Sequence, residues 1–266
     1  MNYILVDASY FIFYRYFALL KWWKHAKPEE NLDNPFENEE FVDKFKKTFI
    51  SKLSEIPKKL KINKIDYKFI FAQDCQRTDI WRINYFPEYK SNRILDDSFM
   101  GGPFFKLGFD LLKENKYIIL NSENLEADDC IAITISNLLK RNIIEDQYFI
   151  IANDMDYLQI VNNTNIYLFN LQFKNIFKNK NWNQDPEKDL LYKIIIGDKS
   201  DNIPSIFKKC GPKTAQKCII DTEFFKEKLD KEKAHDKFNL NKKIIDFKEI
   251  PQNLTYKLIK FIKENI

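Results

Sequence analysis

Nine carboxylates stand along this chain where strand-like runs end or helix-like runs begin. In a folded α/β sheet, hydrophobic strands bring the acids at their carboxyl ends to one edge. Carboxylates gathered in this way repel one another unless cations neutralise them, and oxygen ligands without histidine or cysteine suit Mg²⁺ or Mn²⁺. The pattern predicts metal-assisted phosphate chemistry. The residues are Asp7, Asp74, Glu126, Asp128, Asp129, Asp154, Asp156, Asp198 and Asp201.

Each acidic string also has a structural interpretation. The triplet in 125–132 opens an apolar helix, where acids cap the free amides, although three acids exceed what capping needs. The D-x-D string in 150–156 follows a buried strand and is also typical of an Asx turn. Asp198 and Asp201 are spaced to lie on one face of a helical turn, or simply in the turn that ends a helix.

The elements that would position these acids alternate along the chain. Runs rich in β-branched and aromatic residues occupy Tyr3–Val6, Tyr67–Phe71, Tyr117–Leu120, Tyr148–Ile151 and Ile166–Phe169. Helix-like stretches at 41–60, 104–113 and 127–140 separate most of them. Alternation of this kind predicts an α/β fold with a mostly parallel sheet flanked by helices. Asp7, Asp74 and Asp154 each follow the carboxyl end of a run, where such sheets place their sites.

The 266 residues can form one large domain with a smaller appendage. Residues 24–40 resemble a surface loop, and after Asp185-Pro186 the pattern becomes helical and basic. We predict a catalytic domain at 1–188 and a small helical domain at 189–266. The net charge is +4, yet from Ser205 onwards fifteen lysines face nine acids. This basic tail beside an acidic site suits a polyanion, although individual lysines are more typical of solvated helix faces.

Several classes of protein are excluded. The four cysteines form no CxxC pair, so zinc is not expected, and reduced thiols indicate a reducing compartment. Neither of the two histidines lies near a nucleophile signature, which argues against a histidine-based triad. The apolar start contains Asp7 and Arg15 and lacks a preceding basic region, so neither a signal peptide nor a membrane span is expected. We expect a soluble intracellular monomer, cytoplasmic or nucleoid, with viral or organellar origin left open.

Together the acidic strings resemble the 5′-nuclease (flap endonuclease) family in order and in approximate spacing. They are Val6-Asp7-Ala8-Ser9-Tyr10, Phe71-Ala72-Gln73-Asp74, Glu126-Ala127-Asp128-Asp129, Asp154-Met155-Asp156 and Gly197-Asp198-Lys199-Ser200-Asp201-Asn202-Ile203-Pro204. The resemblance spans roughly residues 2–251. It implies a PIN-like fold in which all nine acids ligate two Mg²⁺ or Mn²⁺ ions that bridge the scissile phosphate. One ion would activate the attacking water and the other would stabilise the leaving 3′ oxygen.

A second matching stretch covers residues 81–93 and ends in Tyr89-Lys90-Ser91-Asn92-Arg93. It resembles the gateway that lies above the metals in this family, within a short arch around 81–107. The resemblance implies that Lys90 and Arg93 hold the scissile phosphate, that Tyr89 stacks on an unpaired base, and that Arg82 contacts DNA. The alternative is an ordinary basic surface helix with core aromatics.

The third stretch, 206–217, looks like the family's helix–hairpin–helix element, in which backbone amides hold a duplex phosphate and carbonyls often hold K⁺. The chain departs from the family at Lys209, where a glycine is usual. The resemblance therefore supports the hairpin geometry and the K⁺ site less strongly than it supports the acids. The implied DNA contacts are Lys208, Lys209, Gly211, Lys213, Thr214 and Lys217.

Residues 240–251 are similar to the end of the phage ribonuclease H branch, whose members degrade RNA primers and the adjacent DNA. The resemblance therefore implies a 5′→3′ exonuclease or flap endonuclease that acts on branched or nicked double-stranded DNA or on RNA–DNA hybrids. Its products would carry a 5′-phosphate, and its partners would include a replication polymerase or clamp. A PIN-type ribonuclease and a non-catalytic protein that binds DNA structures remain the alternatives, and single-stranded RNA cleavage would favour the first.

Overall fold

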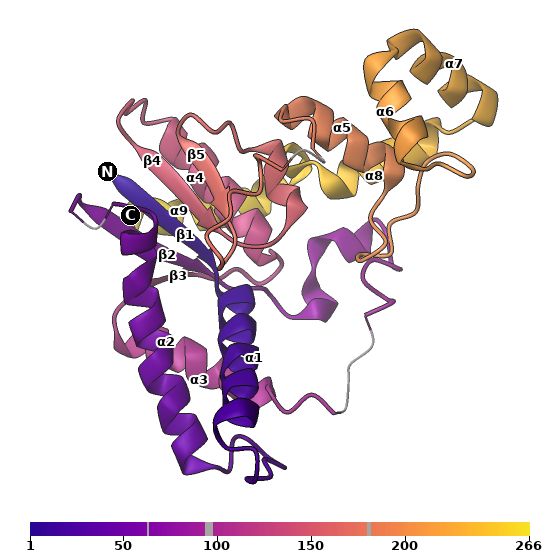
Figure 1. The fold of residues 1–266 in the computed structure, drawn as a ribbon. Coiled ribbons are helices and arrows are strands. Elements are labelled where there is room, and N and C mark those ends of the chain that lie inside the picture. The colour runs from indigo at the N-terminus through magenta and orange to yellow at the C-terminus, as the bar shows by residue number, and fades with distance from the viewer. Residues whose placement is uncertain (63, 94–97, 180–181) are drawn as a thin grey trace.

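The fold is built on a five-stranded parallel sheet with the strand order β3-β2-β1-β4-β5 (Figure 1). The computed structural model describes residues 1–62, 64–93, 98–179 and 182–266. The five strand runs expected from the sequence are confirmed, because buried parallel strands appear in a sequence as short apolar runs. The strands are β1 Asn2–Asp7, β2 Tyr67–Ala72, β3 Ile118–Leu120, β4 Gln147–Ile151 and β5 Ile166–Phe169.

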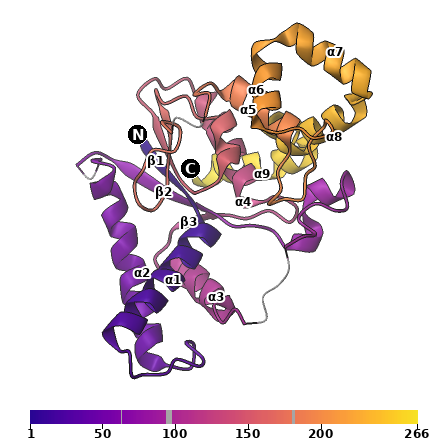
Figure 2. The same ribbon diagram turned by 45° about the vertical axis from the view of Figure 1, so that its right-hand side comes forward.

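Helices cover both faces of the sheet, because successive strand side chains point to opposite sides. Ile4 and Val6 of β1 pack with α1, α2 and α3, while Tyr3 and Leu5 pack with α4 and α9. Figure 2 shows α1–α3 together on one side of the strands and α4 with α9 on the other. These helices are α1 Ala8–Ala26, α2 Glu39–Lys59, α3 Gly102–Glu114, α4 Ala127–Leu139 and α9 Gln252–Asn265.

Helix α2 shows why these segments become helices that pack on the sheet. Apolar residues recur every three or four positions and form one buried face, while lysines and acids occupy the other. The Asn38 side chain caps the first turn by accepting from the amide of Phe41 at 2.9 Å. The loop expected at 24–40 is shorter than predicted, because α1 continues to Ala26.

A second group of helices lies beside the sheet domain, at the upper right of Figure 1. Its members are α5 Pro186–Ile196, α6 Pro212–Ile220, α7 Thr222–Glu232 and α8 His235–Ile245. The chain then returns, since Phe247, Leu254 and Ile262 are buried in the same core as α4. The boundary at 188/189 stays a proposal. Helix α9 packs on the sheet domain through α4, while Phe247–Glu249 also contacts α8.

Short 3-10 helices connect several of these elements: η1 Arg77–Asp79, η2 Trp81–Asn84, η3 Met155–Gln159 and η4 Phe247–Glu249. The arch expected around 81–107 includes residues 94–97, which lie outside the described residues, so its path is not traced. Among the described segments, no helix has the length and apolar character needed to cross a membrane.

Candidate metal centre

The predicted acids gather at the carboxyl edge of the sheet. Asp7 ends β1 and caps α1 by accepting from the amide of Tyr10 at 2.9 Å. Asp74 follows β2 and accepts from the amide of Ala127 at 2.9 Å, which ties it to the first turn of α4. Asp154 follows β4 and caps η3. Because β1, β2 and β4 are adjacent and parallel, their carboxyl ends meet at this edge.

The electrostatics show that these acids repel one another in the absence of cations. Burial, together with the negative charges of Asp74 and Asp154, raises the pKa of Asp7 to about 7. Burial and the neighbouring Asp129 raise the pKa of Asp128 well above its ordinary value. A divalent cation removes this repulsion, so the site favours a metal over bare carboxylates.

The acidic triplet combines the two interpretations of its sequence. Glu126 and Asp129 form a reciprocal capping box at the start of α4. Carboxylate oxygens of Glu126, Asp128 and Asp129 also lie within 4.8 Å of one another, which is close enough to share an ion. Asp129 differs from the other two because it is fully buried and both of its oxygens accept hydrogen bonds from Arg82.

Two basic residues of the gateway reach this cluster. Lys90 forms an ion pair with Glu126 and lies 3.7 Å from Asp201. Arg93 pairs with Asp201. Burial raises the pKa of Glu126, but the charges of Arg82 and Lys90 outweigh it, so the net shift is downward. Lys90 and Arg93 therefore lie beside the acids, and their partners in this structure are carboxylates.

Residues 198–203 form a closed turn directly after α5, which agrees with the turn at a helix end and not with a further turn of helix. The amide of Asp198 donates to the carbonyl of Ile203 at 2.9 Å, and the amide of Ile203 donates back at 2.7 Å. Gly197 permits this closure because its φ is 74° and a Cβ there would lie 2.4 Å from the Ile203 carbonyl oxygen. The two acids consequently face different partners, Asp198 toward α5 and Asp201 toward the gateway.

Lys193 lies among the predicted acids, a position that the sequence did not reveal. Its ammonium group forms ion pairs with Asp156 of η3 and with Asp198, the latter at 2.9 Å. Burial raises the pKa of Asp198, but Lys193 and hydrogen bonds from Ser200 lower it to about 2. The only signal was a lysine in the last turn of a helix, where lysines commonly face solvent. Lys193 and Asp198 are five residues apart, a spacing that does not place two side chains on one face of a helix. They meet because the turn at 198–203 folds back toward α5.

Two predicted contacts with nucleic acid are wrong because the side chains are buried. Arg82 is 2% exposed, and its guanidinium donates to Glu126, Asp129 and the carbonyl of Ile244. A buried guanidinium held by four hydrogen bonds inside the protein cannot reach DNA. Tyr89 is 4% exposed, so its ring cannot stack on a base. Its hydroxyl lies 3.0 Å from Glu126 and 3.1 Å from Asp201 and links the two acids.

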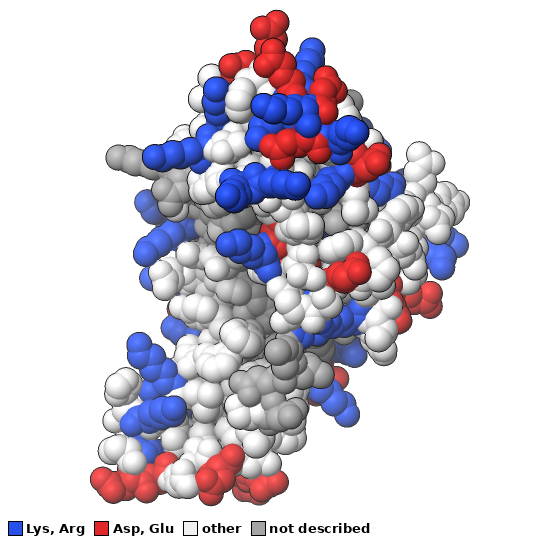
Figure 3. Space-filling model, turned by 90° about the vertical axis from the view of Figure 1, so that its right-hand side faces the viewer, with Lys and Arg blue, Asp and Glu red and all other residues white. Residues whose placement is uncertain are grey.

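The stretch at 206–217 begins in the loop after α5 and continues into α6. Lys209 has a φ of 51°, the left-handed conformation that a glycine adopts freely, so the hairpin turn forms although the glycine is replaced. Gly211 is the N-cap of α6, and Lys208, Lys209 and Lys213 are exposed. Lys217 lies 3.8 Å from the centre of the Phe224 ring, which positions its ammonium group over α7. Figure 3 shows basic side chains gathering over this part of the molecule, with acidic ones among them.

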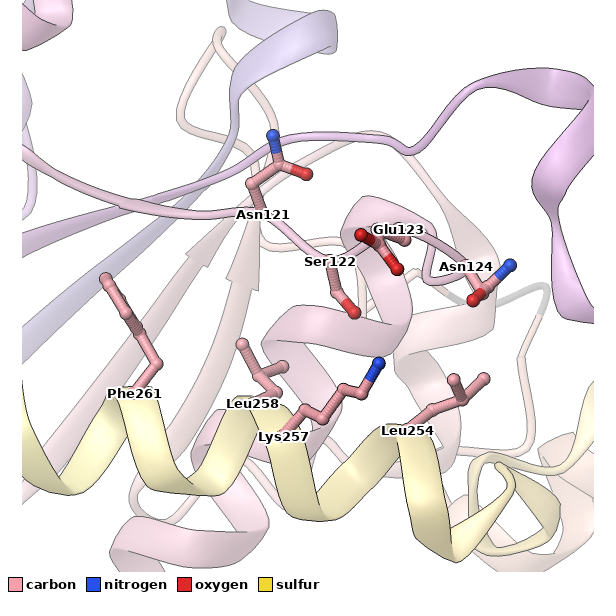
Figure 4. Close-up of a pocket in the computed structure, with 8 residues that line it drawn as sticks. All are labelled: Asn121, Ser122, Glu123, Asn124, Leu254, Lys257, Leu258 and Phe261. Carbon is pink, nitrogen blue, oxygen red and sulfur yellow. The ribbon is translucent and has the colours of Figure 1, made fainter.

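A pocket elsewhere on the molecule does not belong to the acidic site. It lies between the loop after β3 and helix α9, has a volume of about 460 Å³, and contains one lysine, Lys257, and one acid, Glu123 (Figure 4). With one cation and one acid in a mixed polar and apolar lining, it offers no set of ligands comparable to the acids that follow the strands.

Comparisons with known proteins agree with this arrangement. The family model of the 5′-3′ exonuclease N-terminal resolvase-like domain matches residues 2–187. A 5′-3′ exonuclease of Mycoplasmopsis pulmonis is 28% identical over 214 residues, which cover 77% of this chain and 62% of that protein, less than two thirds of its length. Ribonuclease H of Enterobacteria phage T4 is 24% identical over 215 residues, or 73% of this chain and 69% of that protein.

Among solved structures, the fold resembles the flap endonuclease of bacteriophage T5, determined as a pseudo-enzyme-product complex with DNA and metal ions. The TM-score is 0.69 at 16% identity, covering 99% of this chain and 98% of that one. At this level of identity the likeness establishes the fold.

Proposed function

Because this chain belongs to the 5′-3′ exonuclease family, we propose that it is a structure-specific, metal-dependent 5′→3′ exonuclease and flap endonuclease. It hydrolyses phosphodiester bonds near the 5′ end of branched, nicked or RNA-primed DNA and leaves a 5′-phosphate. The observation that carries this proposal is the meeting of Asp7, Asp74, Asp154 and the acidic turn of α4 at one edge of the sheet. The activities named for the two relatives support the same reaction class.

The donor set fits divalent ions. It consists of carboxylate oxygens without histidine or cysteine, which is the ligand class of Mg²⁺ and Mn²⁺. The raised pKa of Asp7, caused by burial and by the charges of Asp74 and Asp154, supports a site that gains from a bound cation. When bound, two such ions supply a nucleophilic water at neutral pH and stabilise the leaving oxygen. We assign the ligands to the nine acids, with Asp129 also serving to hold Arg82 in place.

The basic residues of the gateway are proposed to change partners when substrate binds. Lys90 and Arg93 now neutralise Glu126 and Asp201. Once divalent ions supply that neutralisation, the two side chains are free to hold the scissile phosphate and stabilise its developing charge. Asp201 and Glu126 remain tied together through Tyr89, which keeps the acids in place during the exchange.

The hairpin and α6 are proposed to hold the duplex beyond the cleavage point. The exposed cations of Lys208, Lys209 and Lys213, with the first amides of α6 after Gly211, suit the phosphate backbone of DNA. Thr214 and Lys217 lie in the same first two turns. We include K⁺ at this hairpin in the proposal, and we propose that the protein acts as a monomer in primer or flap removal beside a replication polymerase or clamp.

The test is incubation with Mg²⁺ or Mn²⁺ and 5′-labelled or 3′-labelled substrates: a 5′ flap, a nick, a gapped duplex, an RNA–DNA hybrid and a single strand. We expect cleavage of the flap, nick and hybrid substrates near the 5′ end, and none in EDTA. Product lengths place the cut. Preferential cleavage of single-stranded RNA would instead support a PIN-type ribonuclease, and binding without cleavage in either metal would support a non-catalytic protein.

A further inference from the structure

A second cavity lies between α1, α2 and the loop that follows β5. Its volume of about 360 Å³ falls within the range of about 300–1,000 Å³ typical of small-ligand pockets. The loop wall is fixed to α1, because the amide of Leu171 donates to the hydroxyl of Tyr10 at 3.1 Å. The side chains that matter below are Tyr14, Arg15, Lys52, Glu55, Lys59 and Phe173.

Arg15 is the unusual member of this lining. It makes no hydrogen bond or ion pair with any residue that the structure describes, and its Nε is buried without a partner. Burial lowers the pKa of the Arg15 guanidinium. A buried N–H without an acceptor is costly, and the planar guanidinium matches the paired oxygens of a phosphate or carboxylate. The cavity therefore presents a positive group that calls for an anion.

The remaining charges strengthen this conclusion. Lys52 and Lys59 of α2 line the same cavity, and the one acid, Glu55, is 2.7 Å from Lys52. Three cations against one acid leave the lining at +2. The rings of Tyr14 and Phe173 form apolar walls beside these cations. A phosphate attached to a flat aromatic base, as in a nucleotide, matches both parts of the lining, because the face of a base stacks on aromatic rings.

We propose that this cavity binds a nucleotide through its phosphate, with Arg15 and Lys59 on the phosphate and Tyr14 beside the base. The ligand is either a free 5′-mononucleotide or the 5′-terminal nucleotide of a strand, which present the same chemistry. The site is separate from the acids, because Arg15 is eight residues beyond Asp7 on α1, about 12 Å along the helix axis. The proposal goes beyond nuclease activity and holds without it.

The experiment measures binding by calorimetry with the full chain. EDTA is present so that metal-dependent binding at the acids does not contribute to the measured heat. The probes are inorganic phosphate, dTMP, thymidine, and a dT trinucleotide with a 5′-phosphate or a 5′-hydroxyl. We expect dTMP to bind at least tenfold more tightly than thymidine. Tighter binding of the phosphorylated trinucleotide than of dTMP assigns the strand end, and the reverse assigns the mononucleotide. Absence of dTMP binding overturns the proposal.

Four variants place the ligand in the cavity. Arg15→Gln and Lys59→Gln should each weaken dTMP binding about tenfold, since each removes a charge-assisted contact. Glu55→Gln should tighten it, because the only acid of the lining is removed and Lys52 is released. Lys58→Gln, an exposed neighbour outside the cavity, should leave it unchanged. Lys59 is also exposed, so its variant stays folded. If the Lys59 variant and a correctly folded Arg15 variant both bound dTMP with unchanged affinity, dTMP would bind elsewhere.

Discussion

Arg82 and Asp129 form a bidentate ion pair inside the protein, with nitrogen–oxygen distances of 2.7 and 2.8 Å. The guanidinium is 2% exposed and the carboxylate is fully buried. The pair joins the gateway to the first turn of α4 and so positions Glu126, which also accepts from Arg82 at 2.9 Å. The gateway thus sets the geometry of the acids through a residue that never meets solvent.

Arg82→Gln should destabilise the protein by about 3–5 kcal/mol, because it leaves buried carboxylates without their counter-charge. Urea unfolding followed by circular dichroism measures the change. Arg141→Gln removes a guanidinium from an exposed residue and should cost no more than about 1 kcal/mol. Equal effects of the two variants would show that the buried pair has no special role.

Asp198→Asn should abolish cleavage of a 5′-flap substrate in Mg²⁺ and leave flap binding in Ca²⁺ unchanged. The substitution removes a charged ligand while keeping the shape of the turn. Gel-based cleavage assays and fluorescence anisotropy measure the two properties. Asp236→Asn, at an exposed residue of α8, is the matched control and should retain full activity. Turnover by the Asp198 variant would contradict its role as a ligand.

Lys193→Gln should increase the affinity for Mn²⁺ without DNA by about tenfold, measured by electron paramagnetic resonance of free Mn²⁺. The lysine neutralises Asp156 and Asp198, so its positive charge opposes a divalent ion at the same carboxylates. Lys188→Gln, on the same helix but paired with Asp185, should change nothing. Weaker Mn²⁺ binding in the Lys193 variant would show that the lysine organises the ligands instead of competing with the ion.

The metal-free protein should lose stability as the pH rises from about 4 to about 7. The folded protein holds the proton of Asp7 up to a pKa of about 7, whereas its ordinary pKa is 3.8, so ionisation is disfavoured in the folded state. Thermal unfolding in EDTA at pH 5, 6, 7 and 8 measures the slope of melting temperature against pH. Mg²⁺ should reduce this slope, because the ion favours the ionised carboxylate. Asp7→Asn should also make the melting temperature less dependent on pH in this range. A slope identical in EDTA and Mg²⁺ would count against a cation at Asp7.

Lys209→Gly should be more stable than Lys209→Ala by about 1–2 kcal/mol, because only glycine adopts a φ near 51° without strain. Both variants lose the same charge, so both should weaken duplex binding equally. Chemical unfolding and fluorescence anisotropy separate the two effects. Equal stability of the variants would mean that the left-handed turn does not persist in solution.

The sequence revealed the strands because each is a short run of β-branched and aromatic residues buried on both faces. It revealed the acids because carboxylates follow several of these runs, and three acids at the start of one helix exceed what capping needs. It failed for side chains whose neighbours are distant. Arg82 looked like a surface cation, since its partner Asp129 is 47 residues away. Helix α9 looked like part of a separate domain, although it packs on α4.

By itself, the sequence determined the parallel α/β architecture and the acidic character of its carboxyl edge, because periodicity and residue type are local properties of the chain. Only the tertiary structure decided which charges meet. Lys193 bridges Asp156 and Asp198 because a glycine turn folds 198–203 back toward α5. Tyr89 joins Glu126 to Asp201 because two segments 75 residues apart lie side by side. The energy of an ion pair depends on distance and burial, and both arise only when the chain is folded.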